Sequence, residues 1–251
     1  MTEEYLYLAI ELGEKLLISG AEVSRVEESL TRICSAYGSA RTDVYATTSS
    51  IVVSVEKEDG RVITQTRRIA STTTDIEKLD YLNNLSRKVT ASKPTAEEFR
   101  EMLKRVNEIK QYSSWLVIFC YALIAGAFTL FFGARTPLEI LFSFIIGGII
   151  GVINMTGERL GLQKLLLKLV CSFTACTLAF LVAKIPIIPT VDNIIIGNVM
   201  SLIPGIGLTN ALRDLFTGDV NTGILRSIDA LLLGIVIAAG YILSAFIMGG
   251  I

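Results

Sequence analysis

The sequence has no histidine, one tryptophan and four cysteines among its 251 residues. Without histidine it has no imidazole for acid–base catalysis, and most zinc sites are excluded. Cys34, Cys120, Cys171 and Cys176 have the spacing of neither a metal site nor a disulfide framework. The sequence also lacks a phosphate-binding glycine loop and a nucleophile elbow. We therefore expect a protein that binds no metal or cofactor and is not an enzyme.

Charge is scarce in the second part of the chain. Residues 1–110 hold 16 Lys and Arg and 18 Asp and Glu, whereas residues 111–251 hold only 7 and 6. The net charge is −1 and no basic patch stands out, so nucleic acid is not an expected partner. This division predicts a soluble domain over 1–110 and a membrane domain over 111–251.

The second part contains apolar segments that match the thickness of a bilayer, about 18–22 residues each. Five transmembrane helices are predicted in contact with lipid, over residues 115–132, 138–155, 164–186, 193–212 and 230–251. Nine Lys and Arg lie on one side of these spans and two on the other. The positive-inside rule then places the N-terminal domain in the cytoplasm and the C-terminus outside, in a multi-pass protein of the cell (inner) membrane.

The first part shows mixed periodicity. Helices are predicted over 2–18 and 22–37, and strands over 43–55 and 61–70 with a turn at 58–60. Capping boxes at Thr74–Glu77 and Thr95–Glu98 predict two more helices, the second leading directly into the first span. The fold class is therefore an α-helical membrane domain of five spans preceded by a small α+β soluble domain.

The most informative stretch is NVMSLIPGIGLTNALRDLFTGDVNTGILRSID, residues 198–229. Pro204 and Gly205 interrupt an apolar segment, and lipid cannot satisfy the backbone groups that such a break frees. Transporters place substrate sites at breaks of this kind. The alternative is a span that ends at Pro-Gly and continues as a structural loop.

Polar residues surround this break. We predict substrate binding by Asn198, Ser201, Pro204, Gly205, Asn210 and Arg213. We predict coupling or gating by Asp214, Asp219, Arg226 and Asp229. Arg213 suits a carboxylate because its guanidinium is bidentate, and Asp229, the acid nearest an apolar helix, is the candidate for proton coupling.

Each assignment has a structural alternative. The charges at 213–229 could form an interfacial ion-pair network instead of a polar vestibule, with Arg226 and Asp229 paired at i, i+3. Asn198 and Ser201 could bond a neighbouring helix. Gly147-x-x-x-Gly151 is expected to serve close helix packing and not a substrate.

Three patches resemble the threonine/serine exporter family. They are Gly-Ala-Glu-Val-Ser-Arg-Val-Glu at 20–27, Thr-Ser-Ser-Ile at 48–51 with Thr66-Arg67-Arg68, and Ile-Pro-Gly at 203–205 with the charged residues up to Arg226. Some members of this family fuse two five-span halves, whereas others split them into two subunits. The resemblance implies the N-terminal half, a partner subunit of five spans, and export of threonine and serine or of a dicarboxylate such as succinate.

The sequence thus predicts one component of a secondary exporter for a small molecule, driven by the proton gradient. Assembly with further copies of itself stays open. The alternative is a membrane-tethered regulatory or scaffold subunit whose partner carries the transport pathway. Because five is odd, a second half that follows the first would begin outside, and the two halves would be antiparallel.

Overall fold

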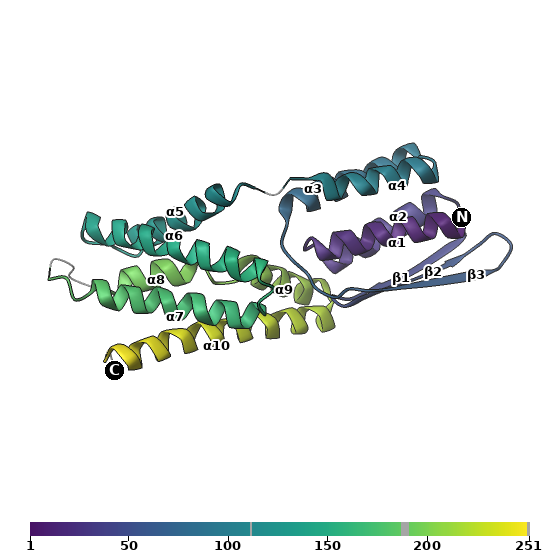
Figure 1. The fold of residues 1–251 in the computed structure, drawn as a ribbon. Helices are drawn as coiled ribbons and strands as arrows, with labels where there is room; N and C mark the ends of the chain where they lie inside the picture. The colour runs from purple at the N-terminus through teal and green to yellow at the C-terminus, as the bar shows by residue number, and fades with distance from the viewer. Residues whose placement is uncertain (111, 187–190, 250–251) are drawn as a thin grey trace. The chain divides into compact units, whose positions relative to one another are not determined.

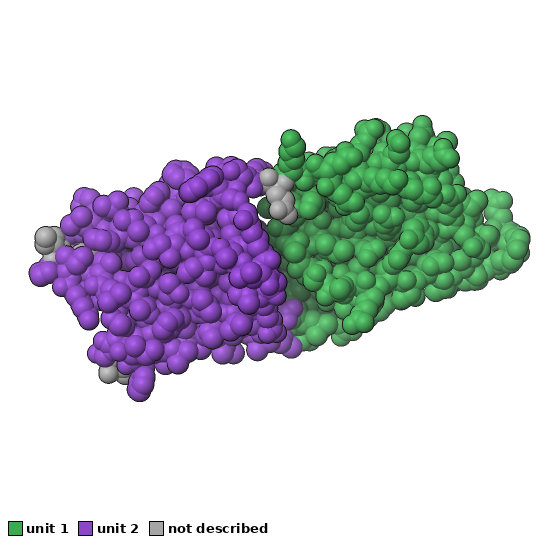
Figure 2. Space-filling view, in the orientation of Figure 1, with its two compact units in different colours: residues 1–110, 209–226 green, residues 111–208, 227–251 purple. Residues whose placement is uncertain are grey.

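The computed structural model describes residues 1–110, 112–186 and 191–249. The protein is mostly helical and has one three-stranded sheet (Figure 1). The chain divides into two compact units, coloured separately in Figure 2. Unit 1 contains residues 1–110 and 209–226, and unit 2 contains residues 111–208 and 227–251, of which 111, 187–190 and 250–251 lie outside the described residues. A segment beyond the predicted boundary at residue 110 therefore returns to the N-terminal unit.

Unit 1 begins with two helices and continues with a sheet and two further helices. Its elements are α1 Glu3–Ile18, α2 Val23–Ala36, β1 Arg41–Ala46, β2 Ser50–Glu56, β3 Val62–Arg68, α3 Ile76–Ser92 and α4 Ala96–Arg105. The strands are antiparallel in the order β1-β2-β3. Within this unit α1 and α2 cover one face of the sheet, and α3 and α4 pack on the far side of these helices (Figure 1).

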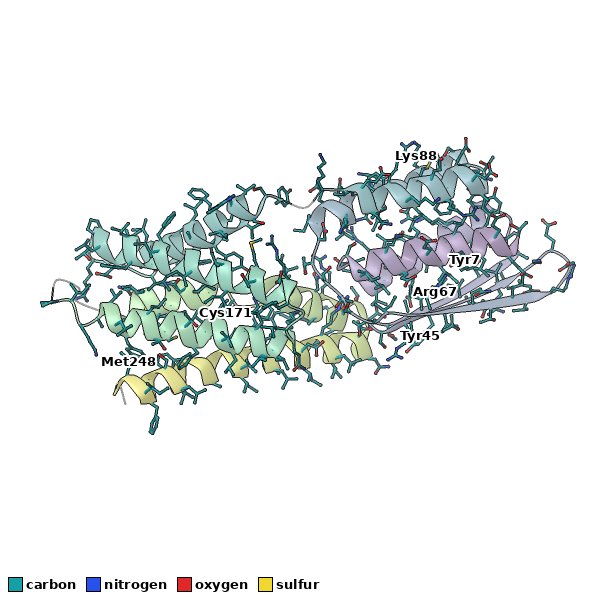
Figure 3. All side chains as sticks on the ribbon, viewed as in Figure 1. Tyr7, Tyr45, Arg67, Lys88, Cys171 and Met248 are labelled. Carbon is teal, nitrogen blue, oxygen red and sulfur yellow. The ribbon has the colours of Figure 1, made fainter. Side chains whose placement is uncertain are left out.

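The sheet is amphipathic because side chains alternate between its faces. On β2, Ile51, Val53 and Val55 are buried against the helices, while the residues between them are partly exposed. The guanidinium of Arg67 on β3 lies 4.5 Å from the ring centroid of Tyr7 on α1 (Figure 3). This cation–π interaction joins β3 to α1 at a position where the Tyr7 side chain is exposed.

Three predictions for this unit were wrong in detail. The strand expected over 43–55 is a hairpin of β1 and β2, in which Thr47 accepts the amide of Ser50. The cap of α3 is Asp75, whose carboxylate accepts the amide of Lys78, one residue after the expected Thr74. Finally, α4 ends at Arg105 and a 3-10 turn follows at Val106–Glu108, so α4 does not lead directly into the first span. The capping box at Thr95 is confirmed.

Unit 2 is built of apolar helices, most of them long. They are α5 Ser114–Phe131, α6 Pro137–Arg159, α7 Lys164–Val182, the short α8 Asp192–Met200 and most of α10 Val220–Met248. Among the described residues, four helices are long and apolar enough to cross a membrane. A fifth span is formed if α8 and α9, Gly205–Thr217, count as one, and these two helices are bent by 60°. Helix α10 begins ten residues before the predicted fifth span, whose expected end at 250–251 lies outside the described residues.

Close packing in unit 2 depends on glycine. A Cβ at Gly147 on α6 would lie 2.6 Å from the Cβ of Ala125 and 2.8 Å from the carbonyl oxygen of Tyr121 on α5. A Cβ at Gly151 would lie 3.0 Å from the Cβ of Tyr121. The predicted packing role of this glycine pair is confirmed, because α5 and α6 approach where no side chain fits.

Candidate functional site

The junction of α1 and α2 forms the first half of a charged region in unit 1. Gly20 has φ +97°, and a Cβ there would lie 2.8 Å from the carbonyl oxygen of Thr73. The amide of Thr73 donates to the carbonyl of Ile18 at 2.8 Å and holds the junction in place. Only glycine fits this conformation and approach. The junction then leads to Ala21 and to Glu22 at the start of α2.

The turn between α9 and α10 forms the second half. Gly218 has φ +97° in this turn, and the amide of Asp219 donates to the carbonyl of Asp214 at 2.9 Å. A Cβ at Gly223 would lie 2.6 Å from Cγ of Leu215, so the first turn of α10 packs closely on α9. The glycines of this motif therefore fix a tight helical hairpin.

Two arginines join these halves. Arg226 donates through Nη1 to Oδ2 of Asp214 at 2.8 Å and through Nη2 to the carbonyl oxygen of Ala21 at 3.0 Å. Arg213 forms an ion pair with Glu22. Asp214 is buried, with 1% of its side chain exposed, whereas the Arg213 side chain is 51% exposed. We call the following residues the charge cluster: Ala21, Glu22, Glu27, Arg213, Asp214, Asp219 and Arg226.

Glu27 extends the charge cluster toward the sheet. Its Oε1 accepts the amide of Ala46 at 2.8 Å. Burial raises the pKa of the Glu27 carboxyl, the Ala46 hydrogen bond opposes this shift, and the negative charge of Asp219 adds to it. The cluster contains four carboxylates, and the ionised form of Glu27 is disfavoured by burial and by the negative charge of Asp219.

A second polar group lies inside unit 2, just before the break. Asn198 on α8 donates through Nδ2 to Oγ of Ser143 on α6 and to the carbonyl oxygen of Ile194, both at 2.9 Å. Thr129 on α5 donates to Oγ of Ser143 at 2.6 Å. All three polar side chains are fully buried. Within the described part of the chain, Oδ1 of Asn198 has no hydrogen-bond partner.

The break follows one turn later. Oγ of Ser201 donates to the carbonyl oxygen of Asn198 at 2.7 Å, and the amide of Leu208 donates to the carbonyl of Pro204 where α9 begins. Ser201 also lines an open hollow of about 410 Å³ with Tyr112, Cys120, Tyr121 and apolar side chains of α5. The break therefore combines a buried amide, a hydroxyl and an accessible space.

The structure brings together some of the predicted site residues and separates others. Arg213 contacts Glu22, which the sequence did not suggest, and Arg226 contacts Asp214 instead of the expected Asp229. Asp229 is exposed on α10. Asn210 is half-buried on α9, and Pro204 and Gly205 lie at the bend.

Sequence reasoning missed several polar groups in the membrane helices. Thr129 and Ser143 complete the Asn198 group. Glu139 is fully buried in a capping box with Thr136. Lys168 on α7 donates to Asn154 on α6 at 3.0 Å. The signal that could have found them is the rarity of such residues in apolar helices, where polar side chains face the bundle interior.

Comparison with known proteins decides the family. The sequence profile of the family described as "Putative threonine/serine exporter" matches residues 7–248. The chain belongs to this family. With four to five membrane-span candidates, it is a multi-pass membrane protein of a transporter-type family.

Curated relatives span the same region. "Probable succinate transporter subunit YjjP" of Klebsiella aerogenes is 24% identical over 245 residues, which cover 96% of this chain and 93% of that protein. The Escherichia coli K12 protein of the same name is also 24% identical, with 96% and 94% covered. "Probable threonine/serine exporter" of Mycobacterium tuberculosis is 24% identical over 97% of this chain but only 46% of its own length. No solved structure matches the chain.

Proposed function

We propose that this chain is one subunit of a two-subunit secondary exporter for small amino acids such as threonine and serine, or for a dicarboxylate such as succinate. Family membership over residues 7–248 and the apolar helices support a transport role. The proposal places the protein in the cell membrane with its N-terminal α+β domain in the cytoplasm. The nine basic residues on one side of the spans support this orientation.

The observation that carries the proposal is the polar group beside the bent helix pair. Asn198 is buried among α5, α6 and α8, and its Nδ2 is directed to the Ile194 carbonyl, which can only accept. The amide oxygen Oδ1 is therefore an acceptor, and no donor reaches it within residues 1–110, 112–186 and 191–249. Leaving a buried polar group without a hydrogen bond destabilises the folded protein by about 1–3 kcal/mol. A substrate that donates a hydrogen bond would remove this cost.

This chemistry favours an amino acid. The ammonium and hydroxyl groups of threonine and serine donate hydrogen bonds, whereas a fully ionised dicarboxylate only accepts them. Access to Asn198 would require α8 to separate from α5 and α6, as in alternating access. Succinate is the second candidate, because the two relatives whose own length is nearly covered, at 93% and 94%, are named succinate transporter subunits.

Arg213 stays a candidate contact for the substrate carboxylate. Its guanidinium suits such a group. In the structure it is paired with Glu22 at an exposed position, so a substrate would have to displace that carboxylate. Asn210 lies three residues earlier on the same helix, and we propose it as a second contact for the substrate.

The partner would be a second five-span subunit. The chain covers 46% of the longer threonine/serine exporter, which leaves room there for a second half. The relatives named as subunits agree with a split arrangement. The rival function is that of a regulatory or scaffold subunit, with the pathway carried by the partner alone.

Reconstitution tests the proposal. Proteoliposomes loaded with labelled threonine, serine or succinate would contain this chain with its partner, the partner alone, or this chain with Asn198→Leu. We expect efflux from the pair and strongly reduced efflux with the Leu variant, which fills a similar volume without polar atoms. Equal efflux from the partner alone would support the scaffold function, and no efflux of any substrate from the pair would contradict the proposal.

In the same assay Arg213→Lys should weaken apparent affinity only if Arg213 holds the substrate.

A further inference from the structure

Asp214 differs from the other acidic residues that follow residue 110. Glu139 is also fully buried, but its carboxylate accepts the amides of Arg135 and Thr136, the hydroxyl of Thr136 and the side chain of Asn193. Glu158 accepts from Asn154. Asp192 and Asp229 are exposed. Asp214 alone in this group combines a buried side chain with a carboxylate oxygen that no donor reaches within the described residues.

The surroundings of Asp214 carry charges of both signs. From α10, Arg226 reaches Oδ2 at 2.8 Å. Its own helix contributes Arg213, and the turn contributes Asp219. Glu22, the residue just before α2, is paired with Arg213 and also with Arg25 on α2. Glu27 on α2 interacts electrostatically with Asp219. Asp214 thus has one direct cationic partner, and three other carboxylates share the cluster.

The unpartnered oxygen has a simple chemical requirement. A buried carboxylate oxygen is stable when it accepts hydrogen bonds or when the group is neutral. A proton supplies neutrality, and it is small enough for a site with 1% of the side chain exposed. Among the described residues no cluster of three or more candidate ligands could hold a metal ion.

We propose that Asp214 is a proton-binding site whose occupancy decides whether Arg226 stays attached to the 20–27 segment. A proton from the aqueous phase adds to Oδ1, and the Asp214–Arg226 pair changes from neutral to a net charge of +1. Arg226, whose side chain is only 14% exposed, is then a nearly buried cation without its counter-charge. Such a cation is unstable at that position. Arg226 therefore leaves Asp214 and the Ala21 carbonyl, and the hairpin of α9 and α10 separates from α2.

This inference rests on the proposed export function for its purpose, because a proton site can couple export to the proton gradient. It assigns that role to Asp214 and not to Asp229, which the sequence favoured. Helix α10 continues without interruption from Val220 to Met248, so a displacement at Arg226 acts on a helix that also belongs to unit 2. Proton binding itself is measurable without any transport.

The test uses the full chain in lipid nanodiscs without substrate. Spin labels are attached at Glu28→Cys on α2 and Phe216→Cys on α9, both exposed positions, in a Cys120→Ser background. The distance distribution between the labels is measured over a range of pH. We expect one short, narrow distance at high pH and a longer, broader distribution as the pH falls. Asp214→Asn, a permanently neutral side chain, should give the broad distribution at every pH.

Asp43→Asn is the matched control, because Asp43 is an exposed carboxylate paired with Arg41, and this variant should titrate like the parent. A parent chain whose distances do not change with pH would overturn the proposal, and so would a folded Asp214→Asn chain that keeps the parent response. Should Asp214→Asn fail to fold, Asp214→Glu replaces it: a shifted midpoint supports the site, and an unchanged midpoint overturns it. Failure of the transport assay with an intact titration would instead count against the export function alone.

Discussion

The two arginines of the charge cluster sit in different surroundings. Arg226 and Asp214 have 14% and 1% of their side chains exposed, whereas Arg213 and Glu22 have 51% and 17%. Solvent screens an exposed pair, so its contribution is about 0–1 kcal/mol. Removing one partner of a buried pair leaves an uncompensated charge, and about 3–5 kcal/mol is lost.

The two pairs should therefore respond unequally to the same substitution. We expect Arg226→Met to lower the free energy of unfolding by about 3 kcal/mol or more, and Arg213→Met by less than about 1 kcal/mol. Denaturant unfolding of the full chain in detergent measures both. Equal losses of unfolding free energy in the two variants would contradict the difference in burial between the two pairs.

Glu27 gives a pH-dependent prediction at the same scale. Because burial raises the pKa of its carboxyl, the ionised form is less favourable in the folded than in the unfolded chain. The resulting destabilisation of the folded chain is at its full size when the pH is above the pKa of Glu27 in the folded chain. It is absent when the pH is below the pKa of Glu27 in the unfolded chain. Glu27→Gln keeps an acceptor for the amide of Ala46 and should stabilise the protein at neutral pH, with a gain that vanishes on acidification. Unfolding curves across pH test this, with the exposed neighbour Glu28→Gln as control; a parent more stable than the Gln variant at neutral pH would contradict it.

At the scale of elements, helix contacts in unit 2 are set by which glycines face a neighbour. A Cβ at Gly147 would lie 2.6 Å from the Cβ of Ala125, whereas a Cβ at Gly148 would meet nothing closer than 3.7 Å. Overpacking a well-packed interface costs about 1–3 kcal/mol. We expect Gly147→Ala to destabilise the protein by this amount and Gly148→Ala to leave it unchanged or slightly more stable, as judged by thermal unfolding. Similar effects of the two would contradict the packing of α5 on α6.

The break between α8 and α9 gives the second prediction at this scale. Proline lacks an amide donor and its ring clashes with the carbonyl four residues earlier, so Pro204 favours the 60° bend. Pro204→Ala should straighten the pair, preserve membrane insertion and reduce transport. Pro137→Ala is the matched control, because Pro137 is the first residue of α6, a position where proline is tolerated. Full transport by Pro204→Ala would favour a purely structural break.

How far the sequence predicts these elements depends on how local their cause is. The helices of unit 1 and the Thr95 capping box follow from periodicity and short-range hydrogen bonds. The hairpin of β1 and β2 was missed because its turn at Thr47 contains no glycine or proline, and the residues on both sides favour strands. Asp75 and Thr74 are adjacent acceptors, and the sequence does not distinguish between them.

The candidate site was predicted less well than the fold. The residues at 198–229 were identified from polarity beside a helix break, which is a local signal. Their partners were not identified from the sequence, because Arg213 pairs with Glu22, which lies 191 positions earlier in the chain. Arg226 could pair with Asp229 by helical spacing, yet it pairs with Asp214, twelve residues earlier, because the α9–α10 hairpin brings that carboxylate to 2.8 Å from Nη1.

At the scale of the whole molecule, the orientation in the membrane is a prediction from charge. Nine Lys and Arg against two place residues 1–110 and the 156–164 loop in the cytoplasm. A reporter active only in the cytoplasm should work when fused near Lys110 or within 156–164, and should be silent at Ile251, which lies outside the described residues. The reverse pattern would contradict the orientation and, with it, the cytoplasmic position of the charge cluster.

The central claim is that the break between α8 and α9 binds the exported molecule. The most direct measurement is protection of a cysteine at this break in the reconstituted pair of subunits, using Ser201→Cys in a Cys120→Ser background and a small maleimide. Ser201 is half-buried and lines the hollow of about 410 Å³, so we expect reagent and substrate to compete for this space. The account predicts that the transported amino acid or dicarboxylate slows modification at Ser201→Cys in proportion to its occupancy and leaves the exposed control Phe131→Cys unaffected. An unchanged rate at Ser201→Cys with a saturating, transported substrate would contradict it.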